Sequence, residues 1–305
     1  MLNHCTRFHS HRPLAVIRVT GEDAGAFLQG QFTNDLQQKE GSVVYGLWLN
    51  QKGRVVADSH VLRLAEKEYI LVSGTSTVAV IGKRLEDYII ADDVVLKDET
   101  ERFSGLSLWG AECGDRLIAL IGVAPAKGRF FIGGDCVVFA GRSISEENYE
   151  IVGPEEKVAR LATRLREMNC VEAGAEEAAW ERLIRGIPSV PQDIGPGDLP
   201  NEGGLEQTAI SYTKGCYLGQ EVMARLKNLG QVRRKLHLVR GRGVPPRPLD
   251  AVFQQGRKVG EIRSVAAQGD EFAALAMLSL LGLNSESGLS LGSDESVTLR
   301  ICPYE

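Results

Sequence analysis

The residues of this sequence that could do chemistry gather in one octapeptide, residues 214–221, which reads KGCYLGQE. Within it, the thiol of Cys216 is bracketed by glycines, lies close to Lys214 and precedes a stretch with helical character. A nearby ammonium group and a helix N-terminus both favour the thiolate, which is the nucleophilic form of cysteine. The glycines also allow the backbone to approach a ligand closely. We therefore expect Cys216, with Lys214 beside it, to be a reactive thiolate.

A second interpretation of Cys216 is a small apolar residue in a tight turn, with Lys214 merely solvated. The residues alone leave the two interpretations nearly level. His60 and His237 are the remote candidates for a base, but spacing brings neither of them to the thiol, so the case for a Cys–His nucleophile is weak. The six cysteines are scattered and form no C-x-x-C pair, so no metal site is expected.

The composition is that of a globular protein with about two domains. The chain has 305 residues, of which 43% are hydrophobic and 25% charged, and these values exclude wholesale disorder and a fibrous fold. Its 35 basic and 40 acidic residues give a net charge of −5, which argues against a generic nucleic-acid coat. No apolar stretch approaches the ~20 residues that cross a bilayer. We therefore expect a cytoplasmic protein with reduced thiols and no membrane anchor.

Hydrophobic periodicity predicts an α+β chain that ends in an all-β module. Strands are predicted at residues 15–20, 43–49, 54–64, 69–73, 94–97, 103–109, 129–132, 136–140 and 149–152. Apolar residues at helical spacing predict a short helix through residues 27–28 and longer helices near 78–89, 154–168 and 175–185. From residue 231 onward, short strands separated by Gly and Pro are typical of a small β-barrel.

The octapeptide, read as K-G-C-Y-x-G-Q-E with Arg225 following, resembles the signature of the YgfZ/IBA57 group of folate-binding proteins, which are relatives of the glycine-cleavage aminomethyltransferases. Other stretches agree in order, so that the resemblance extends from about residue 15 to residue 240: VTGEDA at 19–24, FLQGQ at 27–31, TND at 33–35, GRV at 53–55, YEI at 149–151, and Arg182 with GIP at 186–188.

This resemblance implies an aminomethyltransferase-like scaffold in three parts. Two α+β portions would surround a central folate cavity, and a β-barrel would follow at the C-terminus. We expect the first portion to be discontinuous, with residues 1–42 and 142–230, and to carry the thiol loop. The second portion would span residues 43–141 and the barrel residues 231–305.

The resemblance also implies a set of folate-binding residues. In the related aminomethyltransferases a glutamate at the position of Glu150 contacts the pterin ring nitrogens, and one carboxylate can accept two parallel N–H bonds from the 2-amino-4-oxo edge. Periodicity alone favours a solvent-facing Glu150 between inward-facing Tyr149 and Ile151. Arg182 either binds a folate carboxylate or is an ordinary charge on an amphipathic helix. The remaining expected cofactor-binding residues are Gln29, Gln31, Tyr217 and Gln220.

One departure from the relatives bears on turnover. Aminomethyltransferases carry an acidic pair in the strand where this sequence reads Ala57-Asp58. Asp58 is retained as a candidate catalytic carboxylate, but Ala57 cannot transfer protons. We therefore expect folate binding to be retained without aminomethyl transfer, and we do not expect an independent enzyme.

Eight basic residues and no acidic ones occur between Arg225 and Arg247. This basic strip could guide the glutamate tail of folate, or an anionic partner, toward Cys216. Equally, it could be the polar face of β-strands whose Leu236 and Leu238 point inward. No aromatic residue interrupts the segment, so base stacking has no platform and direct tRNA binding is not expected.

The leading hypothesis is a folate-binding accessory protein that uses tetrahydrofolate or a derivative. The resemblance implies a part in the assembly or repair of iron-sulfur enzymes, including those that thiolate tRNA, with iron-sulfur proteins or their assembly machinery as partners. One alternative is a folate-dependent one-carbon transferase or demethylase that uses Asp58. Another is a scaffold that binds a partner through the basic strip.

Overall fold

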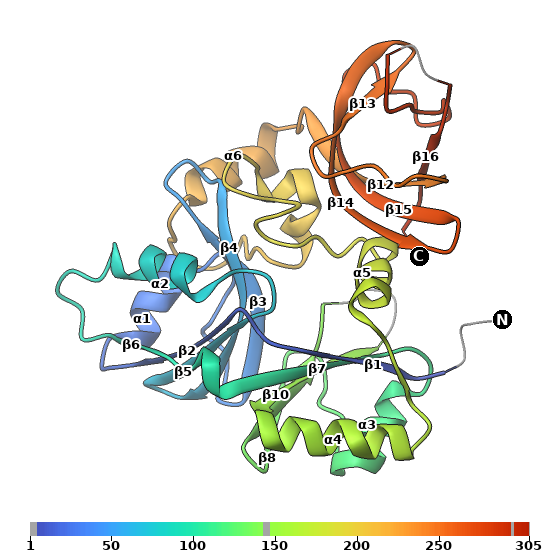
Figure 1. Ribbon diagram of the computed structural model, residues 1–305. Coiled ribbons are helices and arrows are strands. Elements are labelled where there is room, and N and C mark those ends of the chain that lie inside the picture. The colour runs from blue at the N-terminus through green and yellow to red at the C-terminus, as the bar shows by residue number, and fades with distance from the viewer. Residues whose placement is uncertain (1–4, 143–146, 294–295, 305) are drawn as a thin grey trace. The chain divides into compact units, whose positions relative to one another are not determined.

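The computed structural model of the protein describes residues 5–142, 147–293 and 296–304. The chain forms two compact units, each built from two stretches of sequence (Figure 1). The first unit contains residues 1–173 and 208–220, and the second contains residues 174–207 and 221–305. No helix in the described stretches is both long and apolar enough to cross a membrane.

The first sheet of the first unit is antiparallel throughout and has the strand order β3-β4-β5-β2-β6. Helices α1 (Ala24–Gln31) and α2 (Val78–Glu86) pack on one of its faces over a core that includes Trp48 and Leu71. The periodicity predicted all seven of these elements. The strands are β2 (Ala15–Thr20), β3 (Ser42–Leu49), β4 (Val55–Ala65), β5 (Glu68–Ser73) and β6 (Val95–Asp98).

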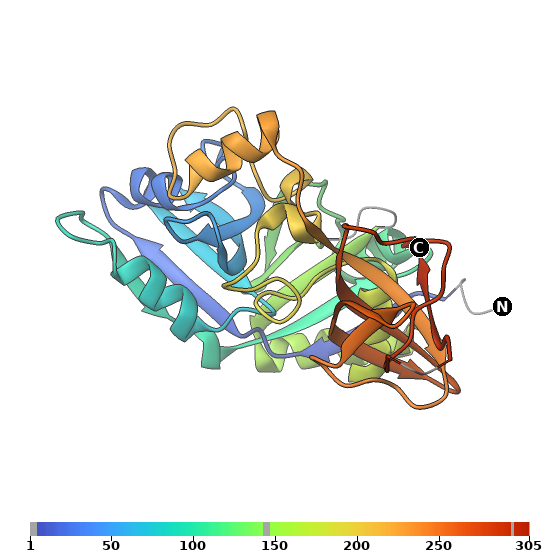
Figure 2. The ribbon, with the colours of Figure 1, turned by 90° about the horizontal axis from the view of Figure 1, so that it is seen from above.

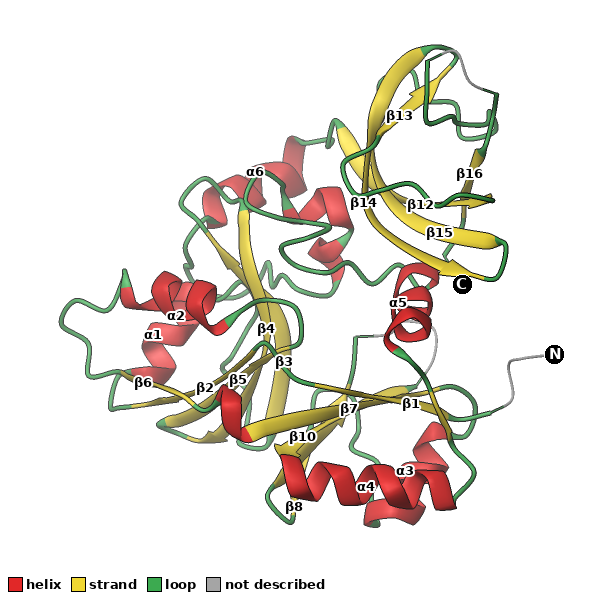
Figure 3. Ribbon diagram, in the orientation of Figure 1, coloured by secondary structure: helices red, strands yellow, loops and turns green. Residues whose placement is uncertain are grey.

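The second sheet of the first unit has the strand order β11-β1-β7-β10-β9-β8. Helices α3 (Cys113–Ile121) and α4 (Glu155–Glu167) cover one face of this sheet, as Figure 3 shows. A short 3-10 turn, η1 (Thr100–Arg102), precedes β7. The strands are β1 (Arg7–His11), β7 (Phe103–Trp109), β8 (Phe130–Gly133), β9 (Cys136–Ala140), β10 (Asn148–Pro154) and β11 (Val171–Glu172).

The uncovered faces of the two sheets pack against each other, so the first unit has four layers, with helices outside and sheets inside. The contact is an apolar cluster to which the first sheet contributes Leu62 and Val72 and the second sheet Phe139 and Val152. Backbone hydrogen bonds from Val43 to Gly128 and from Phe130 to Gly41 also link the layers. Figure 2 shows the same strands and helices from above.

The second unit contains a curled, antiparallel five-stranded sheet in the order β13-β14-β15-β12-β16. Leu236 and Leu238 of β12 are buried, as the inward-facing interpretation of the basic strip predicted. The strands are β12 (Arg234–Arg242), β13 (Ala251–Gln254), β14 (Arg257–Gln268), β15 (Glu271–Ser279) and β16 (Leu299–Cys302). The helical segments are α5 (Ala175–Ile184), η2 (Pro200–Gly203), η3 (Leu205–Gln207) and α6 (Gln220–Leu229), whose first residue belongs to the first unit.

Candidate functional site

Polar side chains gather between the two sheets of the first unit, beside the apolar contact. Side chains in a strand alternate between the two faces of its sheet, and paired residues share a face. Tyr45 pairs with His60 across β3 and β4, and Asp58 lies two residues from His60 on the same face. From the second sheet, Glu150 pairs with Ser107 across β10 and β7. The full set, here called the inter-sheet cluster, is His11, Tyr45, Asp58, His60, Ser107, Arg142 and Glu150.

Asp58 is surrounded by hydrogen-bond donors. Its Oδ1 accepts from the hydroxyls of Ser73, Thr75 and Ser76 at 3.1, 2.9 and 2.7 Å. Its Oδ2 accepts from the Tyr45 hydroxyl at 2.9 Å and from Arg142 at 3.4 Å. A carboxylate offers about four lone-pair sites, so these donors leave no acceptor free for a substrate proton.

Ala57 takes no part in the cluster, because adjacent residues of a strand point to opposite faces. Its side chain is fully buried in the core beneath α1 and α2. The position that departs from the aminomethyltransferase pattern therefore faces the helices, whereas Asp58 faces the second sheet.

The His60 ring lies between the sheets, in contact with two aromatic rings that are tilted by about 50° to it. Its ring centroid is 5.2 Å from that of Tyr45 and 4.8 Å from that of Phe139, and the Arg142 guanidinium lies 4.3 Å above the Tyr45 ring. Burial, with the positive charge of Arg142, lowers the pKa of His60 to about 4. Burial also raises the pKa of Tyr45 well above its ordinary value. Both rings are therefore neutral at physiological pH.

Glu150 is half-buried and faces the first sheet. Its Oε2 accepts a hydrogen bond from the Ser107 hydroxyl at 2.9 Å and lies 3.3 Å from Nε2 of His11. Tyr149 and Ile151 are buried against α3 and α4, as periodicity predicted. The opposite face of β10 meets another sheet rather than open solvent, and pairing between distant strands is not visible in local periodicity.

Cys216 is exposed, in the loop of residues 208–220 that belongs to the first unit. The Nζ atom of Lys214 donates to the carbonyl oxygens of Gln29, Phe32 and Asn34 at 2.7, 2.6 and 3.0 Å. These carbonyls lie at and just beyond the C-terminal turn of α1, and burial lowers the pKa of Lys214 to about 8. Since an ammonium group has three N–H bonds, all three are engaged and none is left for the sulfur. Lys214 holds the loop in place.

The backbone conformation and close packing at position 219 explain why a glycine is found there. Its φ is +86°, and a Cβ there would lie 2.9 Å from the carbonyl oxygen of Asn50 in the β3–β4 hairpin. Gly215, in contrast, has open space around it. Tyr217 is buried, and its hydroxyl has no hydrogen-bond partner among the described residues. The backbone N–H of Gln220 donates to the Tyr217 carbonyl as α6 begins.

Three further predicted cofactor-binding residues are bonded within their own units. The side-chain amide of Gln29 donates to Asp35 and accepts from the backbone N–H of Leu36. The side-chain oxygen of Gln31 accepts from Arg84. Arg182 lies in the second unit, where it pairs with fully buried Asp193 at 2.6 Å and donates to the Ile187 carbonyl and the Ser264 hydroxyl. The roles predicted for these three residues in folate binding remain predictions.

The basic strip is partly neutralised inside the second unit. Arg234 contacts Asp198 at 2.6 Å and Glu202 at 3.0 Å, and Arg242 contacts Glu271 at 2.7 Å. The acidic partners belong to the segment after α5 and to β15, so the sequence of the basic strip alone could not predict this neutralisation.

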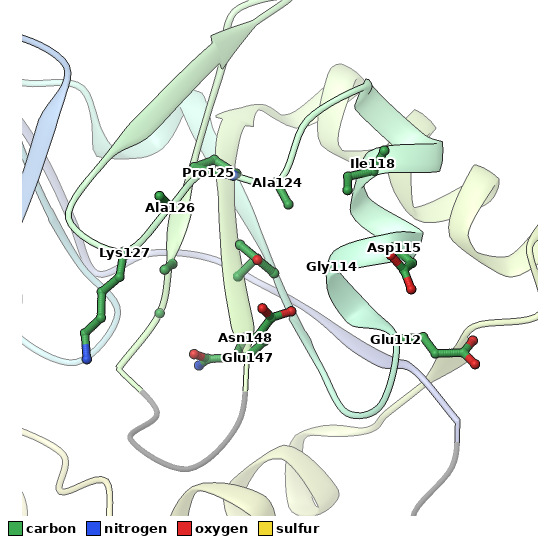
Figure 4. Close-up of a pocket in the computed structure, with 13 residues that line it drawn as sticks. Glu112, Gly114, Asp115, Ile118, Ala124, Pro125, Ala126, Lys127, Glu147 and Asn148 are labelled. Carbon is green, nitrogen blue, oxygen red and sulfur yellow. The ribbon is translucent and has the colours of Figure 1, made fainter.

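A cavity of about 770 Å³ lies between α3, residues 124–127 and the start of β10. Tyr149 lines it from the face of β10 opposite Glu150, and none of the predicted site residues lines it. Figure 4 shows Asp115 and Glu112 of its wall on one side and Lys127 on the other. This cavity is separate from the inter-sheet cluster.

Known aminomethyltransferases and an iron-sulfur cluster assembly factor are similar to this chain in structure or sequence. The aminomethyltransferase T of the glycine cleavage system of Bartonella henselae superposes with a TM-score of 0.81 and 19% identity over 98% of this chain and 85% of its own. The aminomethyltransferase of Staphylococcus carnosus is 25% identical over 259 residues, 81% of this chain and 71% of that protein. The human mitochondrial iron-sulfur cluster assembly factor IBA57 is 27% identical over 290 residues, 85% and 74% of the two chains. Residues 10–214 match the model of the GCVT N-terminal domain. The chain therefore belongs to the GCVT N-terminal domain family, as an IBA57-type relative of the aminomethyltransferases.

Proposed function

We propose that this protein binds tetrahydrofolate or a derivative in the inter-sheet cluster and serves the assembly or repair of iron-sulfur proteins without transferring an aminomethyl group. One observation carries the proposal: Asp58 is saturated by hydrogen-bond donors, whereas Glu150 still has an oxygen to offer. Such a site is arranged to hold a ligand rather than to move its protons.

The residues between the sheets fit a folate headgroup. Within the described structure, Oε1 of Glu150 accepts no hydrogen bond, and both contacts to its carboxylate are made by Oε2. A pterin presents two N–H donors along its 2-amino-4-oxo edge, and the two lone pairs of Oε1 can accept them. The neutral rings of Tyr45 and His60 are partly exposed and supply flat surface against which a second flat ring can pack.

The exposed thiol of Cys216 supports the iron-sulfur part of the proposal. Thiolates are the ligands that iron-sulfur clusters prefer, and a cluster takes about four of them. Among the described residues, no group of three or more His, Cys, Asp or Glu side chains could hold a metal ion. Cys216 would therefore act as one transient ligand or redox partner, with the remaining ligands supplied by an iron-sulfur protein or its assembly machinery, tRNA-modifying enzymes included. The name of the human relative supports this class of partner.

Titration calorimetry with 5-formyltetrahydrofolate, a stable reduced folate, tests the binding part. We expect saturable binding to the wild-type protein and a large loss of affinity in Glu150→Gln, which keeps the shape of the side chain but replaces one acceptor oxygen with a donor. No heat of binding with the wild-type protein would remove the centre of the proposal. Equal affinity in both proteins would place the folate elsewhere.

A folate-dependent one-carbon transferase or demethylase is the second candidate, favoured by the retained Asp58 and by the similarity to an aminomethyltransferase. It requires turnover of an amine donor that is lost in Asp58→Ala and kept in Cys216→Ser. The accessory-factor proposal requires the opposite ranking, with Cys216→Ser failing to restore iron-sulfur enzyme activity in cells that lack the protein.

A further inference from the structure

Strand β1 carries two histidines that point to the same side of the second sheet as Glu150. His9 pairs with Ser107 of β7, and His11 pairs with Gly105. The His9 and His11 rings are stacked at 6.2 Å, and Nδ1 of His9 lies 2.9 Å from the Ala173 carbonyl oxygen, which can only accept. His9 is therefore held by the backbone, whereas Nε2 of His11 lies 3.3 Å from Oε2 of Glu150.

His11 reaches Glu150 across an intervening strand. The strand order is β1-β7-β10, so the two residues belong to strands two positions apart. Neighbouring strands are about 4.8 Å apart, and a side chain on β7 would normally separate them. The β7 residue opposite His11 is Gly105, two residues from the Ser107 that is opposite Glu150, and a Cβ added to Gly105 would overlap the His11 imidazole. Because Gly105 has no side chain, the His11 ring can lie over β7 and approach Glu150.

The two contacts to Glu150 fall on the same oxygen. Ser107 and His11 both approach Oε2, while Oε1 accepts nothing from the described residues. Two donors on one oxygen fix the rotation of the carboxylate and leave its other oxygen presented. We infer that His11 is a positioning residue that orients Glu150 across Gly105 for the headgroup of folate, an inference that rests on the proposed folate site.

The proton on His11 makes this role measurable. An ionised carboxylate only accepts hydrogen bonds, so Nε2 of His11 carries a hydrogen in both the neutral and the charged ring. A variant that keeps an N–H donor at this position should therefore keep the orientation of Glu150, whereas a variant without a donor should lose it.

Other ionisable groups face this region without replacing His11. His60 of β4 has a pKa lowered to about 4, so it titrates below the range in which an ordinary histidine does. Asp58 and Arg142 pair with each other at 3.4 Å. His9 lies on the same strand and the same face as His11 but bonds the backbone, which makes it the matched control.

The test measures the affinity for 5-formyltetrahydrofolate by titration calorimetry. In His9→Gln we expect the wild-type affinity. His11→Gln keeps an N–H donor, so it should bind within about twofold of the wild type. His11→Leu should bind about tenfold more weakly. In the Glu150→Gln background, His11→Leu should cause no further loss of affinity, because the carboxylate that His11 orients is gone. Wild-type affinity in His11→Leu, or the same loss of affinity in both backgrounds, would overturn the inference.

A second measurement needs no ligand. The ring nitrogen signals of His11 can be compared by NMR at one pH in the wild-type protein and in Glu150→Gln. Loss of the carboxylate acceptor should shift the signal of Nε2, and an unchanged signal would show that the two groups are not in contact. If the wild-type protein binds no folate but the signal moves, the proposed function fails while the His11–Glu150 pair stands. If folate binds and the signal stays, the positioning role fails alone.

Discussion

The Nζ atom of Lys214 lies 2.7 Å from the carbonyl oxygen of Gln29, a residue 185 positions earlier in the chain. Together with the bonds to Phe32 and Asn34, this contact attaches the thiol loop to the end of α1. The residue expected to activate the thiol therefore fixes the loop on which the thiol is presented.

Replacing Lys214 by Met should loosen this loop, because three partly buried carbonyl oxygens lose their donor. We expect the free energy of unfolding to fall by about 1 to 3 kcal/mol, the usual cost of unsatisfied buried polar groups. Urea denaturation measures the loss, and hydrogen exchange should show faster exchange in residues 208–220. If Cys216 instead lost its reactivity toward a thiol reagent with no change in stability, Lys214 would act on the sulfur after all.

Stability should depend on the protonation of His60. Because its folded pKa is about 4, below the ordinary value of 6.5, the unfolded chain binds the proton more readily. The free energy of unfolding should therefore fall as the pH decreases from about 6.5 toward 4, by up to about 3 kcal/mol.

His60→Phe is the matched variant for this effect, since it keeps a flat ring between Tyr45 and Phe139 but cannot titrate. Urea denaturation at about pH 7 and 4.5 should show a smaller difference in this variant than in the wild-type protein. The same difference in both proteins would assign the acid sensitivity to other groups.

Cys216→Ser should leave stability unchanged, because the side chain is exposed. It should nevertheless fail to restore the activity of an iron-sulfur enzyme in cells that lack this protein. Cys5 is also exposed and provides the control, so Cys5→Ser should restore that activity fully. Full activity with both variants would remove the thiol from the proposed function.

Local patterns predicted most of the elements. The strand predicted at residues 103–109 has the bounds of β7, and the helix predicted near residues 175–185 differs from α5 by one residue. The sequence did not predict β1 or α3. β1 has only Phe8 as an apolar residue, so it shows no alternation. α3 begins after Glu112, whose φ of 61° lies in the left-handed region, and no capping signal marks its start.

The site was only partly visible in the sequence. Asp58 and Glu150 were found, but His11, Ser107, Tyr45 and Arg142 were not, because they meet their partners across strands and sheets. His11 and Glu150 are 139 positions apart, and Arg142 and Asp58 are 84 apart. One signal was available in the sequence. Asp58 and His60 lie on the same face of β4 as buried Leu62, and polar residues on the buried face of a strand indicate a buried polar site.

Arg182 offers a test of the one predicted cofactor-binding residue that lies in the second unit. Its guanidinium pairs with Asp193, whose side chain is fully buried, and removing one partner of such a pair strands the other charge. Arg182→Gln should therefore lower the free energy of unfolding by about 3 kcal/mol, a figure typical of broken buried pairs. The affinity for 5-formyltetrahydrofolate should stay at the wild-type value, because the proposed headgroup site is built from residues of the first unit. A variant that folds normally but binds folate more weakly would instead give Arg182 the role that the family resemblance implies, as a partner of the folate carboxylates.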